Sequence, residues 1–303
     1  MRFAASSALV LATWLALAGL AARGDDEGPP ARLSGTLLEA RRTGLVTIAY
    51  RESSIPFSYL SPRGEPIGYS IELCRKVVDA MSEAVGRELT IGWLAVTPES
   101  RIAAIESGRA DLECGSTTAN AERSRHVAFS PVIFVSGTKL LVRRGSRIHS
   151  FRDLGGKTVA VTAGTTNEEA MRAVARDFHV ALRLVSFRDH AEAFARLAAG
   201  GVDAFATDEV LLYALAASSA HPRDFEVVGE FLSYEPYAIA YRKGDSQMKQ
   251  LVDSTFADLA EDGEIERQYQ RWFMKRLPSG VTLGLPMSAQ FEALVQAMRI
   301  EPE

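Results

Sequence analysis

The sequence predicts an α/β fold of two similar lobes, from three observations. Helical and extended segments alternate along the chain, which is typical of α/β proteins. Two segments, at 105–118 and 197–210, share one frame: an apolar residue, two residues, glycine, two residues, aspartate, a short strand and a polar loop. Upstream of each lies a strand entered from glycine and leaving into serine or threonine, at 44–54 and 156–166. Each half is therefore expected to be a strand–helix–strand unit whose strands end in polar loops.

The repeat also has a simpler explanation, because Gly-x-x-Asp after a helix is a common turn that can occur twice by chance. The doubled pattern of a strand that runs into a polar loop favours paired lobes over coincidence. Two extended segments, at 129–146 and 231–246, would connect the lobes, and the helical segment at 248–273 would return to the first. We expect lobe one at 36–136 plus 236–303 and lobe two at 137–235, with hinges near 135–140 and 232–238.

The chain of 303 residues begins with a segment typical of a secretory signal peptide. Arg2 provides a positive start, Ala4 to Leu20 form a short apolar core, and small residues suited to cleavage follow near Ala21. A membrane anchor is the alternative, but roughly 17 apolar residues lie at the lower limit for spanning a bilayer. We expect a signal peptide at residues 1–22 and a mature protein exported to the periplasm.

An amphipathic helix is expected at 70–86, over the buried strand at 44–50. Its apolar residues recur at helical spacing and Gly86 closes it. A strand at 89–96 follows, and then a helix at 97–108, in which Pro98 suits the first turn.

Composition excludes several classes of function. The formal net charge is −4 and the chain has no basic runs, so nucleic acid is not expected as a partner. The two cysteines, Cys74 and Cys114, lack the spacing of a zinc site, and we expect neither a metal nor a cofactor. Both lie in apolar patterns, so a disulfide and two buried free thiols are equally open alternatives.

Polar side chains gather where the predicted strands end, and open parallel sheets bind ligands at the carboxyl ends of their strands. Those expected to face the cleft between the lobes are Arg51, Arg101, Ser116, Thr118 and Arg123 from lobe one, and Thr165, Thr166, His190 and Asp208 from lobe two. Arginine presents a planar fork of donors that matches a carboxylate, and the loop at 163–169 precedes a helix, where free backbone N–H groups hold anions. Asp208, a lone acid among positive groups, indicates a ligand cation such as an ammonium. An acidic α-amino acid is the smallest common metabolite with two anionic ends and one cationic group.

The charged and ionisable residues of this set also have purely structural explanations. Arg51 could end its strand in a solvated loop, and Arg101 and Arg123 could lie on exposed helix faces. His190 or Asp208 could cap the helix that follows it. Their joint placement at strand ends favours a binding site.

Six segments resemble the periplasmic solute-binding proteins of polar amino acid ABC transporters, most closely the glutamate/aspartate-binding branch. In order, they are RESSIPFSY, GYSIELC, ECGSTTANAER, FSPVIFVSGTKLLV, VAVTAGTTNE and DHAEAFARLAAGGVDAFATDEVLL. The resemblance covers about residues 35–290 and implies the type II periplasmic binding protein fold, with two hinge crossings between sheets flanked by helices. It implies capture of an acidic L-amino acid, glutamate or aspartate, by hinge closure and its delivery to a permease in the inner membrane. We expect a monomer without catalytic residues.

By this resemblance the ligand would be held by three groups of side chains: Arg123, Thr118 and Thr166 on the α-carboxylate, Ser116 and Asp208 on the α-ammonium, and Arg51, Arg101 and His190 around the side-chain carboxylate. Phe57 and Tyr59 would wall the cleft. Pro98 departs from the branch, which carries a serine there that helps hold the distal carboxylate. The preference between glutamate and aspartate is therefore open.

Two other functions remain as alternatives. An enzyme on the same scaffold, of the cyclohexadienyl dehydratase kind, would use His190 or Glu52 as a general base. A ligand-sensing module would report occupancy to a receptor or kinase. No Ser-His-Asp or Cys-His arrangement is readable from the spacing, which favours a binding protein.

Overall fold

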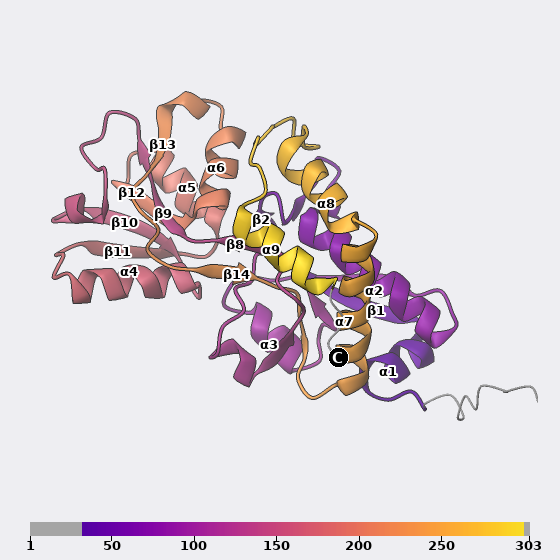
Figure 1. Ribbon diagram of the computed structural model, residues 1–303. Helices are drawn as coiled ribbons and strands as arrows, with labels where there is room; N and C mark the ends of the chain where they lie inside the picture. Colours follow the sequence, from indigo (N-terminus) through magenta and orange to yellow (C-terminus); the bar gives the residue numbers. More distant parts are fainter. Residues whose placement is uncertain (1–31, 300–303) are drawn as a thin grey trace, which may run out of the picture. The chain divides into compact units, whose positions relative to one another are not determined.

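Two five-stranded sheets organise the computed structural model, which describes residues 32–299 (Figure 1). The first sheet contains, in spatial order, β5 (Thr90–Ala95), β1 (Leu45–Tyr50), β6 (Leu112–Glu113), β15 (Ala240–Arg242) and β7 (Val127–Phe129). The second sheet contains β11 (Arg183–Phe187), β10 (Thr158–Thr162), β12 (Ala204–Asp208), β9 (Thr138–Arg143) and β13 (Phe225–Val228). The predicted signal peptide at residues 1–22 lies outside the described residues.

The two sheets follow the same plan. In the first sheet β1 runs parallel to β5 and β6, and β15 is antiparallel to β6 and β7. In the second sheet β10 runs parallel to β11 and β12, and β9 is antiparallel to β12 and β13. Each strand of one sheet therefore has a counterpart in the other, which confirms the structural repeat that the segments at 105–118 and 197–210 predict.

Helices cover both faces of the first sheet. Side chains of Val46 and Ile48 on β1 lie in one hydrophobic cluster, and Ala49 lies in another, because successive side chains of a strand point to opposite faces. The first cluster includes residues of α1 (Gly35–Thr43), α2 (Tyr69–Val85), α7 (Ser246–Glu261), α8 (Glu264–Tyr269) and α9 (Ala289–Met298). The second includes α3 (Arg101–Glu106). The C-terminal helices thus pack with the first sheet, as predicted.

The second sheet is also covered on both faces, which explains its nearly continuous apolar strands. Val159 and Val161 of β10 pack with α4 (Thr166–Asp177) and the short 3₁₀ helix η2 (Phe151–Leu154). Ala160 packs on the opposite side with α5 (His190–Ala198) and α6 (Glu209–Ser218). The remaining helical turns are η1 (Arg123–Arg125), η3 (Pro222–Asp224) and the π-helical η4 (Gln270–Met274).

Two antiparallel strands, β8 (Phe134–Ser136) and β14 (Glu235–Tyr237), lie where the chain passes between the sheets. They overlap the predicted hinges near 135–140 and 232–238, while the boundaries of the lobes stay a prediction. A small sheet after β1 consists of β2 (Ser53–Ser54), β3 (Ser58–Leu60) and β4 (Pro66–Ile67). Between residues 32 and 299, no helix has the length and apolar character that a membrane span requires.

One predicted element begins later than expected. The helix predicted at 97–108 is α3, which starts at Arg101, and Pro98 lies in the turn before it. In that turn Oγ of Ser100 accepts the backbone N–H of Thr97 at 2.9 Å, so a local side-chain hydrogen bond replaces the first helical turn.

Candidate functional site

Strand ends from both sheets meet at one small cavity. Its volume is about 10 Å³, which gives room for roughly one water molecule. The lining residues are Arg51, Arg101, Ser116, Thr118, Thr165, Thr166, Asn167, His190 and Asp208. The structure thus brings together every predicted site residue except Arg123, and it adds Asn167.

The first sheet supplies a cationic wall to this inner cavity. Arg51 follows β1 and Arg101 begins α3, and their exposed fractions are 1% and 2%. Nη1 of Arg101 donates to Oγ1 of Thr117 at 2.7 Å, whereas Nε of Arg101 and both terminal nitrogens of Arg51 have no hydrogen-bond partner within residues 32–299. Burial lowers the pKa of Arg51 to about 10 and that of Arg101 to about 9, so both stay charged at neutral pH. Unpaired buried donors are costly, so these nitrogen atoms are suited to bind an acceptor.

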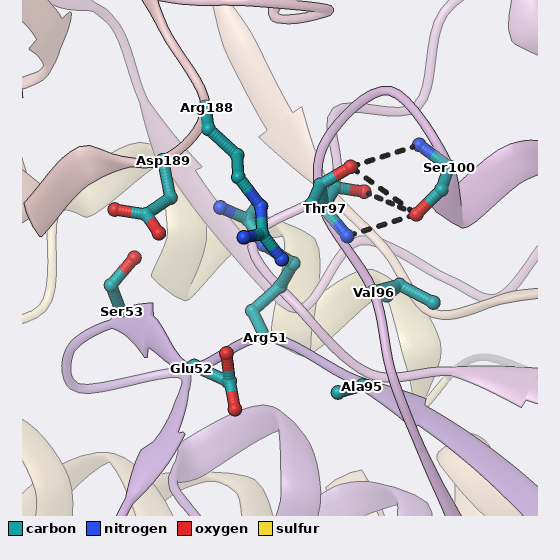
Figure 2. Close-up of a pocket in the computed structure, with 9 residues that line it drawn as sticks. All are labelled: Arg51, Glu52, Ser53, Ala95, Val96, Thr97, Ser100, Arg188 and Asp189. Carbon is teal, nitrogen blue, oxygen red and sulfur yellow. Dashed lines mark hydrogen bonds between the residues drawn. The ribbon is translucent and has the colours of Figure 1, made fainter. Parts of the chain in front are cut away.

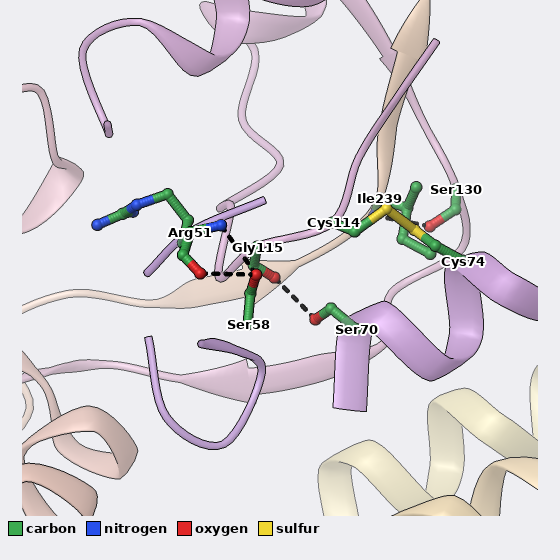
Figure 3. The surroundings of a disulfide bond; sticks show 8 residues. All are labelled: Arg51, Ser58, Ser70, Cys74, Cys114, Gly115, Ser130 and Ile239. Atoms are coloured by element: carbon green, nitrogen blue, oxygen red, sulfur yellow. Dashed lines mark hydrogen bonds between the residues drawn. A yellow bond between two sulfur atoms is a disulfide. The ribbon is translucent and has the colours of Figure 1, made fainter. Parts of the chain in front are cut away.

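Two local hydrogen bonds fix the backbone of Arg51. Oγ of Ser58, on β3, accepts the N–H of Arg51 at 2.9 Å and donates to its carbonyl at 3.1 Å (Figure 3). The backbone of Arg51 is therefore held at the strand end by the chain that turns back after β2. A solvated loop tip, the structural alternative for Arg51, is wrong.

The prediction that Phe57 and Tyr59 wall the cleft is also wrong. Phe57 is fully buried and packs edge-on against Phe273, and Tyr59 packs edge-on against Trp272. Side chains alternate along an extended chain, so directing Ser58 toward the strand end turns its two neighbours into the core.

A disulfide between Cys74 and Cys114 joins α2 to the residue after β6 (Figure 3). The Cα atoms are 6.3 Å apart and the two positions are separated by 40 residues. Next to it, Oγ of Ser70 donates to the carbonyl of Gly115 at 2.8 Å. Of the two alternatives that the sequence leaves open, the structure has the disulfide, and it braces the loop that carries the site residues of the first sheet.

Glu113 is a buried acid that sequence patterns do not single out, because it occupies one position of an apolar strand. It is fully buried, and neither carboxylate oxygen has a hydrogen-bond partner in the described part of the chain. Burial lowers the pKa of Arg51, Arg101 and Arg123, and the charge of Glu113 opposes this shift in each of them. Glu113 therefore acts as an internal counter-charge to the arginines.

His190 is neutral at physiological pH. Its exposed fraction is 2%, and burial, together with the charges of Arg51 and Arg101, holds its pKa well below the ordinary range. Nδ1 lies 2.8 Å from Oγ1 of Thr162. The cap of α5 is Asp189, whose carboxylate accepts the backbone N–H of Glu192, so the capping alternative for His190 is wrong.

The second sheet supplies an acidic corner at Asp208. Its carboxylate accepts hydrogen bonds from Nδ2 of Asn167 at 2.9 Å and from the hydroxyl of Tyr237. Burial, and after it the nearby charge of Glu235, raise the pKa of Asp208 to about 7. Asp208 is the N-cap residue of α6, as the structural alternative predicts, but its side chain makes no capping hydrogen bond.

Glu235, on the crossing strand β14, connects strand-end loops of the two sheets. Its Oε2 accepts from Oγ1 of Thr118 at 2.6 Å and from Oγ1 of Thr166 at 2.5 Å, and its Oε1 accepts from Oγ of Ser233 at 2.5 Å. It is 1% exposed. Sequence analysis missed Glu235, Asn167 and Tyr237, because their roles depend on how the crossing strand passes behind the site.

Arg123 does not line the inner cavity but spans the same two loops. Nη1 donates to the carbonyl of Thr118 at 2.9 Å, and Nη2 donates to the carbonyl of Gly164 at 3.4 Å. Its side chain is half-buried, and desolvation lowers its pKa. The alternative of an exposed helix face is therefore wrong for Arg123, and it is wrong for the buried Arg101.

This arrangement has buried charged groups of both signs around one cavity, so it can bind a small zwitterion. Within the described residues, no group of His, Cys, Asp and Glu side chains is arranged to hold a metal ion. The fold and the site together define a solute-binding protein of the two-lobe α/β kind.

Comparisons with known proteins identify the family. Residues 46–275 match the bacterial extracellular solute-binding proteins, family 3, and the chain belongs to this family. The L-glutamate/L-aspartate-binding protein of Pseudomonas aeruginosa is 41% identical over 266 residues, which are 87% of this chain and 88% of that one. The glutamate/aspartate import solute-binding protein of Escherichia coli is 35% identical over 282 residues, with 92% and 93% of the two chains covered. Among solved structures, an ancestral arginine-binding protein bound to arginine aligns with a TM-score of 0.69 at 28% identity, over 76% of this chain and 98% of that one.

The family confirms two predictions. The fold is that of the type II periplasmic amino acid-binding proteins, as the resemblance implies. The protein is a solute-binding protein and not an enzyme, as its family and curated relatives are.

Proposed function

We propose that this protein captures an acidic L-amino acid, glutamate or aspartate, in the periplasm and delivers it to the permease of an ABC transporter. The observation that carries the proposal is the division of charge across one cavity. Arg51 and Arg101 offer unpaired donors on one wall, and Asp208 is a buried carboxylate on the other. The names of the relatives in Pseudomonas and Escherichia support the same class of ligand.

Each group of the ligand has a counterpart in the site. Its side-chain carboxylate would accept hydrogen bonds from Arg51 and Arg101, and its ammonium would donate to Asp208. Its α-carboxylate would lie beside Arg123 and the hydroxyls of Thr118 and Thr166, which can rotate from Glu235 to a new acceptor. Ser116, Thr165 and His190 would complete the polar shell.

Entry of a whole amino acid requires the lobes to separate, because the inner cavity holds about 10 Å³. Lobe one, at 36–136 plus 236–303, would move against lobe two, at 137–235, about the crossing strands. Closure would exclude water and strengthen the arginine–carboxylate contacts. We propose that the mature chain, after loss of residues 1–22, acts as a monomer and that its closed form docks on the permease.

A ligand screen tests the proposal. In a thermal-shift screen of the twenty amino acids on the purified mature protein, we expect glutamate and aspartate to raise the melting temperature most. Glutarate, which lacks the ammonium, should give no shift. Stabilisation by neutral or basic amino acids alone would contradict the proposal.

Arg51→Ala tests the charge layout directly. We expect calorimetry to show a loss of glutamate affinity of at least about 100-fold, because two charge-assisted hydrogen bonds disappear. The matched control is Arg63→Ala, at an exposed arginine in the turn before β4, which should leave the affinity unchanged. Equal affinities of the two variants would remove Arg51 from the binding site.

A further inference from the structure

A second and larger cavity lies on the outer side of Arg51. Its volume is about 180 Å³, against about 10 Å³ for the inner cavity. A cavity needs about 10–15 Å³ to hold one water, so this outer cavity has room for a chain of several heavy atoms. It lies among the segments that follow β1, β5 and β11, and thus has walls from both sheets.

Arg51 belongs to both cavities. Its two terminal nitrogens are buried and have no partner within residues 32–299, so they can serve an acceptor from either side. A carboxyl group bound to Arg51 from the inner site would therefore stand at the opening of the outer cavity. Whatever is attached to that carboxyl group would extend outward.

The outer cavity carries its own charged groups. Figure 2 shows the side chain of Arg188, which follows β11, extending into the cavity from the wall opposite Arg51. Glu52 and Asp189 line the same space. The charge of Asp189 raises the pKa of Arg51, and only burial and the charge of Glu113 have a larger effect on it. The cavity therefore offers a second guanidinium for an anion and two carboxylates for an N–H group.

We propose that the outer cavity is a subsite for a residue joined by an amide bond to the side-chain carboxyl of an acidic amino acid. The ligand class is a γ-glutamyl or β-aspartyl dipeptide, and this inference rests on the proposed function of the inner site. The amide carbonyl accepts from Arg51, the amide N–H faces Glu52 or Asp189, and the terminal carboxylate pairs with Arg188. Free glutamate would occupy the inner site alone.

Calorimetry with two probes tests this subsite. L-glutamate and γ-L-glutamylglycine are titrated into the mature wild-type protein and into Arg188→Ala, which removes an exposed side chain. We expect the wild-type protein to bind both probes. In Arg188→Ala the affinity for γ-L-glutamylglycine should fall at least about tenfold more than that for L-glutamate, because only the dipeptide pairs its terminal carboxylate with Arg188.

The matched control is Arg183→Ala, at an exposed arginine at the other end of β11. It should leave the ratio of the two affinities unchanged, whereas a changed ratio would assign the effect to overall charge and overturn the subsite. An equal loss for both probes in Arg188→Ala would overturn it as well.

The wild-type titrations separate this proposal from the function on which it rests. Binding of L-glutamate without binding of γ-L-glutamylglycine overturns the subsite and leaves the proposed function standing. Binding of the dipeptide alone supports the subsite and overturns the assignment of a free amino acid. Binding of neither probe overturns both.

Discussion

Asp111 and Asp203 hold the same place in the two halves of the molecule. Each carboxylate accepts the backbone N–H of a threonine on the neighbouring strand, Thr47 or Thr158, at 2.8 Å in both cases. In each half the backbone N–H of the aspartate also donates to the carbonyl of that same threonine at 2.8 Å. These paired contacts give β6 the same register against β1 that β12 has against β10.

The side chains at the strand ends differ although the backbone frame is shared. Counted along the chain from these contacts, Arg51 in the first half corresponds to Thr162 in the second, and Ser116 corresponds to Asp208. The first half therefore places a cation where the second has a hydroxyl, and the second places an anion where the first has a hydroxyl. One scaffold used twice thus produces two complementary walls, which suit a ligand that carries both signs of charge.

The disulfide has no counterpart in the second half, where Ala206 takes the place of Cys114. Replacing both cysteines, Cys74→Ala with Cys114→Ala, should lower the free energy of unfolding by about 4 kcal/mol, the chain-entropy value for the loop of 40 residues. Urea unfolding measures this. Reduction should destabilise the wild-type protein and leave the double variant unchanged, and an equal effect on both would show that the disulfide does not brace the fold.

Asp208→Asn removes the negative charge from the second half and keeps the shape of the side chain. We expect glutamate affinity to fall by about 100-fold or more, because the ligand ammonium loses its charged acceptor. Calorimetry measures the change, with Asp177→Asn at an exposed position as the control. Retained binding would contradict the assignment of Asp208 to the ammonium.

Binding should also depend on pH, since Asp208 must be ionised to accept an ammonium. Burial raises the pKa of Asp208 to about 7, so protons compete with the ligand below that value. Affinity for glutamate should fall by about tenfold per pH unit from pH 7 toward pH 5. Burial and the charges of Arg51 and Arg101 hold the pKa of His190 well below its ordinary range. Calorimetry in buffers of different ionisation enthalpy should detect proton release on binding, and constant affinity across this range would contradict the prediction.

Glu235→Gln should give the smallest effect. The negative charge of Glu235 raises the pKa of Asp208, second to burial, so its removal should lower that pKa. The midpoint of the pH dependence of glutamate affinity should therefore move to lower pH. A matched variant at an exposed site, Glu230→Gln, should leave the midpoint in place. A shift upward would show that Glu235 acts on Asp208 in another way.

Local patterns predicted much of this structure. The ends of two strands can be predicted because apolar runs stop at Arg51 and Asp208. The repeat can be predicted because it includes Asp111 and Asp203, whose carboxylates bind the backbone of the neighbouring strand in each half. The pairing of Cys74 could not be read, since it depends on how α2 lies over the sheet.

The residues that sequence analysis missed share a physical reason. Glu235 and Tyr237 come from a crossing strand, and no local pattern shows which polar groups that strand will meet. Glu113 sits in an apolar strand, where burial alone would predict a hydrophobic side chain. The prediction for Phe57 is wrong because the side chain of its neighbour Ser58 points toward the end of β1, so that of Phe57 points into the core.

Arg51 and Arg101 are almost fully buried in the folded chain. Much of the dehydration penalty of these two cations is therefore carried by the folding equilibrium and not by the binding of an anion. Such a chain should be least resistant to heat when empty and gain resistance steeply with ligand concentration, by mass action. When the ligand is scarce, a larger fraction of this protein would therefore be unfolded.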